Sequence, residues 1–382
     1  MQFREKFLSI SLFVITSFLC GDLALAAGTN VTSSLLLNLG IQYDNNFYYD
    51  AVDERGVTTF LVQPGIELGY ATGKSEIAFR YTLDANYYDE SAEDDFYGHT
   101  ALLDSNFEMT DRLSFNLSDN FVKTRDSAEL DPLGNIATRD QYYQNRLNAI
   151  FELDFKPKFT TQFGYQNRIT DYDDDTREDS KGHMGSFDLI HYLNRSTSLD
   201  LEYHYWNMNY DGPSSDYTSN QLSLVVRKEW RITGLEAAVG YQNRAFKAAD
   251  QGDIDVVPYR LTLLGESSSG KTRYSISAAK NFNLRSDDGY YEANRFSVRL
   301  NRDLTVKITL GLNAYYQKSD YVYTIRADDS YKIIADINFQ IRDRLAFYYS
   351  VGFENRNSNI PSAEYENAMT MGQLRFTHDI AK

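Results

Sequence analysis

The chain has 382 residues, a net charge of −16, 30 tyrosines, 23 phenylalanines and a single cysteine. So acidic a balance argues against a nucleic-acid partner, because the phosphates would be repelled. After the N-terminal segment no apolar run is long enough for a transmembrane helix, and the lone Cys20 allows neither a disulfide framework nor a thiolate metal site.

The first 26 residues have the layout of a secretory signal peptide. Arg4 and Lys6 precede the apolar run FLSISLFVITSFLC, and ALA at residues 24–26 provides an A-x-A cleavage pattern. We therefore expect residues 1–26 to be removed and residues 27–382 to form one folded domain.

An alternation of apolar and polar residues continues along the rest of the chain. Leu35, Leu37 and Leu39 are apolar, whereas Asn38 and Gly40 beside them are polar or small. This period of two indicates a strand with one apolar and one polar face. We expect eighteen such strands, with sixteen as the alternative count. In chain order the expected strands are 33–45, 57–71, 75–88, 97–110, 113–124, 141–155, 159–171, 182–193, 197–210, 217–227, 235–247, 257–267, 272–285, 292–301, 304–318, 329–340, 345–356 and 367–380.

Two kinds of connection alternate between these strands. Short turns such as MTDRL and LNRDL are followed by longer acidic loops such as DYDDDTREDSKG. This pattern predicts an all-β fold, a single antiparallel transmembrane β-barrel of the outer membrane with short periplasmic turns and long extracellular loops. A barrel of this size encloses an aqueous channel. The connection TRDSAELDPLGNIATRD is the candidate for an inward-folded gate.

One phrase occurs three times, as GYQNR at Gly164–Arg168 and Gly240–Arg244 and as GFENR at Gly352–Arg356. Each copy is expected at the upper end of an odd-numbered strand. The aromatic residue in second place would then point outward into an interfacial girdle, and the arginine would point into the lumen.

Inward-facing basic and aromatic residues are the candidates for contact with a solute, because rings of charge set the selectivity of wide pores. Aromatic rings can also pack against the apolar faces of sugars. Two alternatives stay open: the charges form cross-strand pairs, and the aromatics fill space against an inward-folded loop. The candidates are Arg80, Arg146, Arg168, Tyr192, Trp206, Arg227, Arg244, Arg299, Tyr315 and Arg356.

No catalytic, metal or cofactor site is expected. The acidic stretch that begins at Asp171 has the spacing that opens a calcium loop, but it lacks the glycine and the glutamate that such a loop needs. His204 faces inward, yet nothing singles out Ser198 and Asp200 as partners in a nucleophilic triad. We therefore expect a channel and not an enzyme.

The sequence resembles the family of putative beta-barrel porins. The resemblance rests on NLGIQYDNNFYYD from Asn38, VQPGIELGY from Val62 and RDQYYQNRLNAIFELDFKPKFTTQFGYQNR from Arg139. It implies a Gram-negative outer-membrane porin associated with exopolysaccharide export, with a periplasmic polysaccharide export protein as partner. One departure is the C-terminus, which ends on Lys382 where barrels usually end on an aromatic, so Phe376 is expected to serve as the assembly signal.

The expected function is therefore an aqueous channel that exports a secreted polysaccharide. The alternative is a general or solute-selective diffusion porin. The expected partners are outer-membrane lipid and lipopolysaccharide, together with the polysaccharide or small hydrophilic solutes, and no nucleic acid.

Overall fold

The structure is a computed structural model that describes residues 30–89, 95–125, 139–155, 157–174, 177–212, 216–248, 252–286, 289–322 and 324–381. Within these ranges, the side chains of residues 281–286, 289 and 381 are left undescribed. The expected signal peptide lies outside the described residues.

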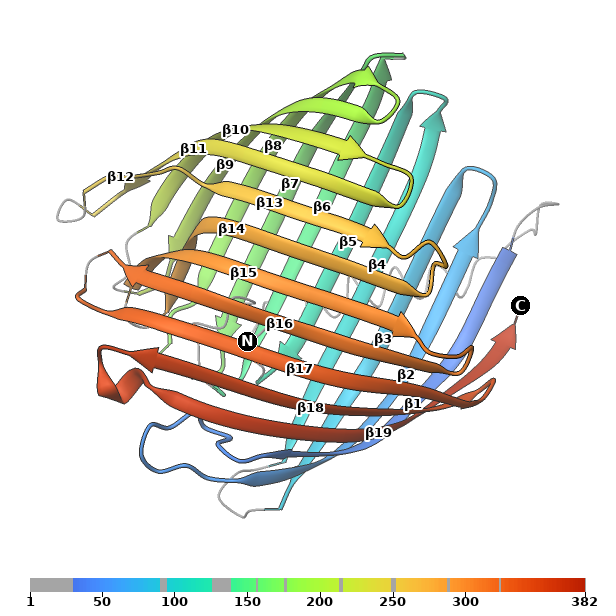
Figure 1. The fold of residues 1–382 in the computed structure, drawn as a ribbon, viewed down its shortest axis with the longest axis vertical. Helices are drawn as coiled ribbons and strands as arrows, with labels where there is room; N and C mark the ends of the chain where they lie inside the picture. The colour runs from blue at the N-terminus through green and yellow to red at the C-terminus, as the bar shows by residue number, and fades with distance from the viewer. Residues whose placement is uncertain are drawn as a thin grey trace.

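Antiparallel strands make up most of this part of the chain (Figure 1). The only helical element described is the short 3-10 turn η2 (Pro361–Ala363), and no helix of the described residues is long and apolar enough to cross a membrane. The strands are β1 (Asn30–Asp44), β2 (Val57–Ala71), β3 (Ser75–Tyr88), β4 (Phe96–Thr110), β5 (Leu113–Thr124), β6 (Tyr142–Phe155), β7 (Phe159–Tyr172), β8 (Ser180–Asn194), β9 (Thr197–Tyr210), β10 (Tyr217–Glu229), β11 (Thr233–Phe246), β12 (Ile254–Val256), β13 (Tyr259–Glu266), β14 (Thr272–Ser286), β15 (Gly289–Asp303), β16 (Ile308–Tyr321), β17 (Ala327–Arg342), β18 (Leu345–Ser358) and β19 (Tyr365–Ala381).

The sheet closes on itself through its first and last strands. Leu37 of β1 lies opposite Pro64 of β2 on one side and opposite Phe376 of β19 on the other. The other strands pair with their neighbours in sequence, so no edge is left open. The predicted antiparallel barrel of eighteen strands is confirmed, and the short β12 is the one addition to it in the described chain.

The additional strand β12 is a short extension beside β13. β12 pairs with β11, where Gln242 lies opposite Val256. β13 pairs with the same strand β11 in the same register, where Val239 lies opposite Tyr259. Pro258 lies between the two pieces and its carbonyl accepts the N–H of Gly240 at 2.9 Å. Because proline has no N–H to donate, the strand is interrupted there.

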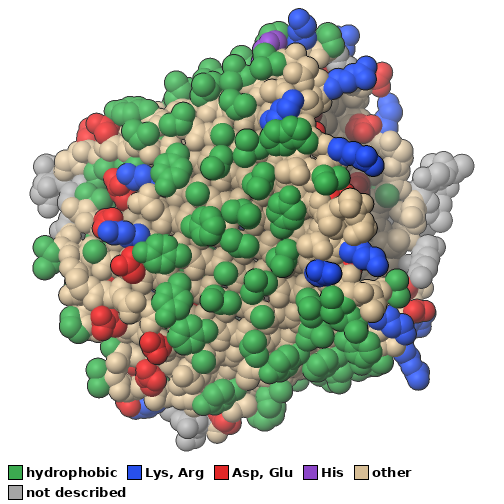
Figure 2. Space-filling view, viewed as in Figure 1, with side chains coloured by type: hydrophobic (Ala, Val, Ile, Leu, Met, Phe, Trp, Pro, Cys, Tyr) green, Lys and Arg blue, Asp and Glu red, His purple; other side chains and the backbone are tan. Residues whose placement is uncertain are grey.

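The alternation of side chains gives the barrel an apolar outer face and a polar inner wall. Leu35, Leu37, Leu39, Ile41 and Tyr43 of β1 are all exposed on the outside. Figure 2 shows hydrophobic side chains across the middle of this outer surface, with charged side chains at its two ends.

Tyrosines of the outer face lie near its long-loop end and are held by hydrogen bonds to the next strand. The hydroxyl of Tyr241 donates to Asp255 at 2.6 Å, and the hydroxyl of Tyr165 lies 2.8 Å from Nδ1 of His183. With Phe353, these are the aromatic residues of the repeated phrase, and all three are exposed as predicted. Such rings suit the membrane interface, because they have one apolar and one polar part.

The short turns all lie at one end of the barrel, where β1 begins and β19 ends (Figure 1). One strand boundary was predicted wrongly: the strand expected at 304–318 begins only at Ile308. The hydroxyl of Thr305 accepts the N–H groups of Lys307 and Ile308, at 3.1 Å each, and so closes a turn over residues that alternate like a strand. Val306 is fully exposed in this turn.

The two faces predict opposite responses to one added charge. Leu39→Arg places a cation on the lipid side of β1 and is expected to destabilise the barrel by about 2–4 kcal/mol near the bilayer midplane. Asn38→Arg, the neighbouring inward position, is the matched control and is expected to be tolerated. Urea unfolding in lipid vesicles, followed by tryptophan fluorescence, measures both; equal destabilisation would contradict the assigned faces.

Candidate functional site

The inner wall contains all of the solute-contact candidates predicted from the sequence. Each lies opposite another inward residue in the strand register, as Arg146 of β6 lies opposite Arg168 of β7. Tyr192 and Trp206 likewise lie opposite the inward Ser198 and Met184. The candidates differ in how much of each side chain is open to the lumen and in what surrounds it.

Arg227 lies at the centre of an ion-pair network near the short turns. Its guanidinium contacts Asp200, and it donates to Glu202 at 2.9 Å and to Glu236 at 2.8 Å. Arg260 of β13 joins the same network through Glu236. Since carboxylates of both neighbouring strands surround it, Arg227 holds the wall together, as the cross-strand alternative predicts.

A second group is open to the lumen. Arg80 and Glu67 form an ion pair at 3.1 Å in which both side chains are about half exposed, so the pair is weak. Arg299 is exposed and forms no ion pair within the described part of the chain. Tyr192 is 41% exposed, and Trp206 is half-buried with its ring edge-on to His204 at 5.4 Å. These are the positions at which a solute has direct access.

A third group lies toward the long-loop end, where arginines stack on tyrosine rings. The guanidinium of Arg244 lies 4.2 Å from the ring centre of Tyr217, and that of Arg295 lies 3.8 Å from Tyr315. Arg244 and Tyr315 are buried. A desolvated cation–π contact contributes about 2 kcal/mol, so these two candidates support the wall, and contact with a solute stays a prediction for the exposed group.

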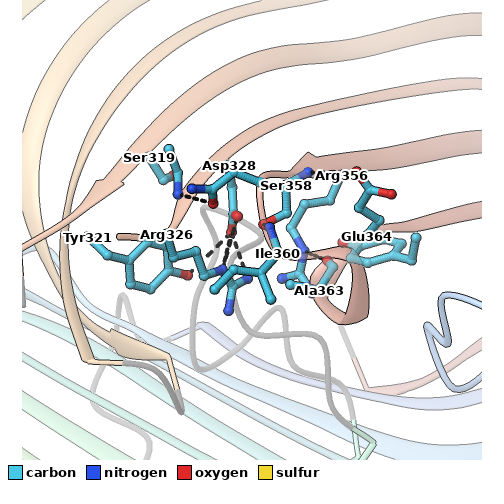
Figure 3. A network of polar contacts seen from close by, with 12 residues as sticks. Ser319, Tyr321, Arg326, Asp328, Arg356, Ser358, Ile360, Ala363 and Glu364 are labelled. Atoms are coloured by element: carbon cyan, nitrogen blue, oxygen red, sulfur yellow. Dashed lines mark hydrogen bonds and ion pairs between the residues drawn. The ribbon is translucent and has the colours of Figure 1, made fainter. Parts of the chain in front are cut away.

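The candidate Arg356 is part of a buried polar network beside η2 (Figure 3). Its Nε donates to the carbonyl of Ala363 at 2.6 Å, and its guanidinium lies 4.6 Å from the ring centre of Tyr365. Nearby, Arg326 binds Asp328 through both nitrogens Nε and Nη2, at 2.6–3.0 Å, with both side chains buried. The hydrogen bond from Arg356 to Ala363 thus holds η2 against the long-loop end of the inner wall.

Sequence reasoning missed Arg326 because it lies in the connection after β16, where strand alternation gives no direction. Strand alternation is enough to place Arg375 and Tyr348 on the inner face, but it does not bring them together. The structure stacks them at 4.1 Å, because the register places Arg375 opposite Ala346, two residues from Tyr348. Sequence alone could have found such pairs only if the register were known.

The loop between β1 and β2, residues 45–56, turns inward and is here named the inward loop. Phe47 meets the inward ring of Tyr88 edge-on at 5.5 Å, and Tyr49 meets the inward ring of Tyr365 at 4.9 Å. The side chain of Asn46 donates to the carbonyl of Glu366 at 2.9 Å. Since these partners lie on the inner wall, the inward loop narrows the outer mouth.

Arg139, just before β6, fastens the inward loop from the other side. Its Nε donates to the carbonyl of Phe47 at 3.0 Å, its guanidinium lies 4.3 Å from the Phe47 ring centre, and it pairs with Asp44 at 3.7 Å. Four strands separate β1 from β6 along the wall. Arg139 therefore connects the inward loop, which follows β1, to the start of β6 on a distant part of the outer mouth.

The backbone of Tyr49 is strained, with φ at 58°. This left-handed conformation is a genuine outlier for a bulky residue and costs of order 1–3 kcal/mol. The contacts of Tyr49 with Tyr365 and with Arg139, which donates to its hydroxyl at 3.4 Å, hold it in place. The inward loop is thus kept in its position against local strain.

The gate expected at residues 124–140 falls largely outside the described residues, so its role stays a prediction. Asp140 at its end pairs with Arg177 at 2.6 Å. Among the described segments it is the inward loop that narrows the mouth, and the only signal for it in the sequence is the aromatic cluster FYY beside two asparagines.

Carboxylates of the outer connections are used in local contacts. Asp171 accepts from the hydroxyl of Tyr143 at 2.5 Å and Asp173 pairs with Lys123 at 3.5 Å, while Asp175 lies outside the described residues. The N–H of Tyr210 and then Lys247 hold the pKa of Asp216 below its usual range. Across the described ranges, no group of three or more His, Cys, Asp or Glu side chains could hold a metal ion.

Removal of the Arg139 side chain is expected to widen the outer mouth. Arg139→Ala deletes the hydrogen bond and the cation–π contact to Phe47, so the inward loop loses its link to the β6 side. We expect a larger single-channel conductance in planar bilayers. Arg55→Ala is the control, because Arg55 lies in the same loop and its guanidinium pairs with the exposed Asp53. Equal conductance of both variants and the unaltered protein would exclude a narrowing role for this contact.

Solved porin structures have the same architecture at very low sequence identity. Pseudomonas aeruginosa OccK2 (OpdF) superposes with a TM-score of 0.55 at 9% identity, over 93% of this chain and all of that one. A second structure of that protein, in complex with glucuronate, gives 0.53 at 10% identity over 92% of this chain and 99% of its own. Acinetobacter baumannii OccAB3 gives 0.51 at 10% identity, with the same coverage of 92% and 99%.

Likeness at this level of identity shows the fold alone. Among curated proteins no match to the sequence is found. Residues 231–378 do match a family, the one described as "Putative beta-barrel porin 2". This match confirms the porin resemblance predicted from the sequence, and the chain is similar to the solved porins in its barrel fold.

Proposed function

We propose that the chain forms an outer-membrane channel through which a secreted polysaccharide leaves the cell. The observation that carries this proposal is the narrowed outer mouth. The inward loop and η2 are fastened to the inner wall by buried contacts, so the resting channel is restricted at the end where a polymer would emerge. In an export channel such a restriction would keep small solutes from leaking through a pore wide enough for a polymer.

The composition of the lower inner wall also supports a saccharide. A concave stretch on β3–β6 is lined by the amides and hydroxyl of Asn106, Asn116, Ser118 and Asn148, together with the carboxylates of Glu76 and Asp104. Some of these groups already bond one another, as Asn148 donates to the hydroxyl of Ser118 at 3.3 Å. Amides and hydroxyls both donate and accept, so they can exchange these bonds for bonds to successive sugar hydroxyls as a chain moves past.

The exposed arginines add a preference for acidic sugars. Arg80 and Arg299 present guanidinium groups to the lumen, and a guanidinium matches the two oxygens of a carboxylate. The amides and hydroxyls of the concave stretch would then bind sugar hydroxyls while these arginines bind uronate carboxylates.

A solute-selective diffusion porin is the second candidate. It is favoured by the likeness to OccK2, whose structure has been solved in complex with glucuronate. In that case the same arginines would select small acidic saccharides, and the inward loop would set the size limit instead of closing the resting channel.

Secreted polymer in a deletion strain separates the two candidates. Deletion is expected to abolish extracellular polysaccharide, and the unaltered gene to restore it. Complementation with Arg80→Gln plus Arg299→Gln is expected to restore several-fold less, because carboxylate contacts in the lumen are lost. Arg55→Gln, an exposed arginine outside the lumen wall, is the control and should restore secretion fully.

Uptake measurements complete this comparison. Liposome swelling in glucuronate and in a neutral monosaccharide reports free diffusion through the purified protein. Unchanged polymer in the deletion strain, together with rapid arginine-dependent swelling in glucuronate, would overturn export in favour of the diffusion porin.

A further inference from the structure

Every one of the eight short turns of the barrel contains a lysine or an arginine between its two strands, and only the turns at Arg112 and Arg344 also contain an acidic residue, Asp111 and Asp343. All eight side chains are exposed. They are Lys74, Arg112, Lys158, Arg195, Arg231, Lys271, Lys307 and Arg344, and together they are named the basic rim.

None of the basic-rim residues forms an ion pair in the part of the chain that the structure describes; Arg344 contacts the imidazole of His378 at 3.1 Å. Cations of the outer connections behave differently. Arg55, Arg177 and Lys247 pair with the carboxylates of Asp53, Asp140 and Asp216 at 2.9, 2.6 and 3.0 Å. These three outer cations are therefore neutralised, whereas the cations of the basic rim are unpaired in the described chain.

The basic rim stands out because the chain as a whole is acidic. The net charge is −16, and the outer connections contain acidic runs such as DESAEDD and DDDTRED. Figure 2 shows blue Lys and Arg side chains gathered along the right-hand edge, at the end of the short turns, with red Asp and Glu side chains toward the opposite edge. The barrel thus has a basic end and an acidic end.

The basic rim encircles a single mouth, because each short turn joins two neighbouring strands of a closed barrel. Adjacent strands lie about 4.8 Å apart, so successive cations are roughly 10 Å apart, close to the Debye length of about 8 Å at physiological salt. Their fields overlap and act on an approaching anion as one positive ring. Short turns and chain termini of such barrels face the periplasm, so the ring surrounds the periplasmic entrance.

Positive charge continues from the rim into the lumen. Beyond Lys271, Arg273 of β14 faces inward and is 59% exposed, with a loose pair to Asp303 at 3.4 Å. Arg299 lies on the adjacent strand, opposite Ser275 and so two residues deeper than Arg273. A track of positive charge therefore leads inward through Lys271, Arg273 and Arg299. A lipid headgroup or a protein that stays outside the mouth would not reach the inner part of this track.

We propose that the basic rim is the capture site for an acidic polysaccharide, whose carboxylates bind the ring before the chain enters along this track. The inference rests on the proposed export function and defines its cargo as a polyanion. The acidic outer end then disfavours binding where the polymer must be released.

Binding of polygalacturonate, a polyuronate, to the purified full-length protein in detergent tests the capture site. The rim variant combines Lys74→Gln, Lys271→Gln, Lys307→Gln and Arg344→Gln, all exposed turn residues. We expect a several-fold weaker affinity and a shallower salt dependence than for the unaltered protein, and no binding of neutral dextran by either. Arg55→Gln plus Lys247→Gln is the control, because it removes cations from the outer end.

Equal polygalacturonate affinity of the rim variant and the unaltered protein would overturn the proposal. It would also be overturned if only anionic phospholipid vesicles, and not polygalacturonate, bound in a rim-dependent way, since the rim would then be a lipid contact.

Secretion in cells separates this inference from the export function. Normal polygalacturonate affinity of the rim variant in vitro, combined with lost secretion in cells, would assign the rim to an acidic periplasmic protein and leave the export function standing. Rim-dependent polygalacturonate binding in a protein whose deletion leaves secretion unchanged would refute export and keep the capture site.

Discussion

The backbone ladder between β1 and β19 is the constraint on which the rest of this structure depends. If the first and last strands were unpaired, two rows of N–H and C=O groups would face hydrocarbon without partners, at several kcal/mol for each group. Closure also fixes the register all the way around, because Leu37 can lie opposite both Pro64 and Phe376 in only one arrangement. A slip by one residue would turn the inward arginines toward lipid.

Within that closed wall, arginine has three different roles that its sequence position does not distinguish. Arg227 is surrounded by carboxylates and connects strands. Arg244 and Arg356 are buried against tyrosine rings and stabilise the upper wall. Arg299 is open to the lumen. A guanidinium that is already stacked or paired has little left to offer a solute, so selectivity depends on the few that are exposed.

The two ends of the barrel are built from opposite principles. At the outer end, Arg55, Arg177 and Lys247 are paired, Arg326 and Arg356 are buried, and the inward loop is held against backbone strain at Tyr49. At the short-turn end, the turns are tight and the cations of the basic rim point into solvent without carboxylate partners in the described chain. One end is therefore suited to restricting passage, and the other to attracting an anion from a distance.

Alternation of residues predicted the face of each strand residue, because a period of two is a local property of the extended backbone. Together with the alternation of short and long connections it predicted a barrel of eighteen strands, with sixteen as the alternative count. The directions of Tyr165 and Arg168, for example, follow from neighbouring residues alone. Only the tertiary structure decided that Arg244 is buried while Arg299 is exposed to the lumen, and that Arg375 stacks on Tyr348. It also decided that residues 304–307 form a turn and that the inward loop contacts Arg139. Each of these depends on a contact between segments that are distant in sequence or on a hydrogen bond that competes with the strand, and the pattern of apolar and polar residues contains no information about either.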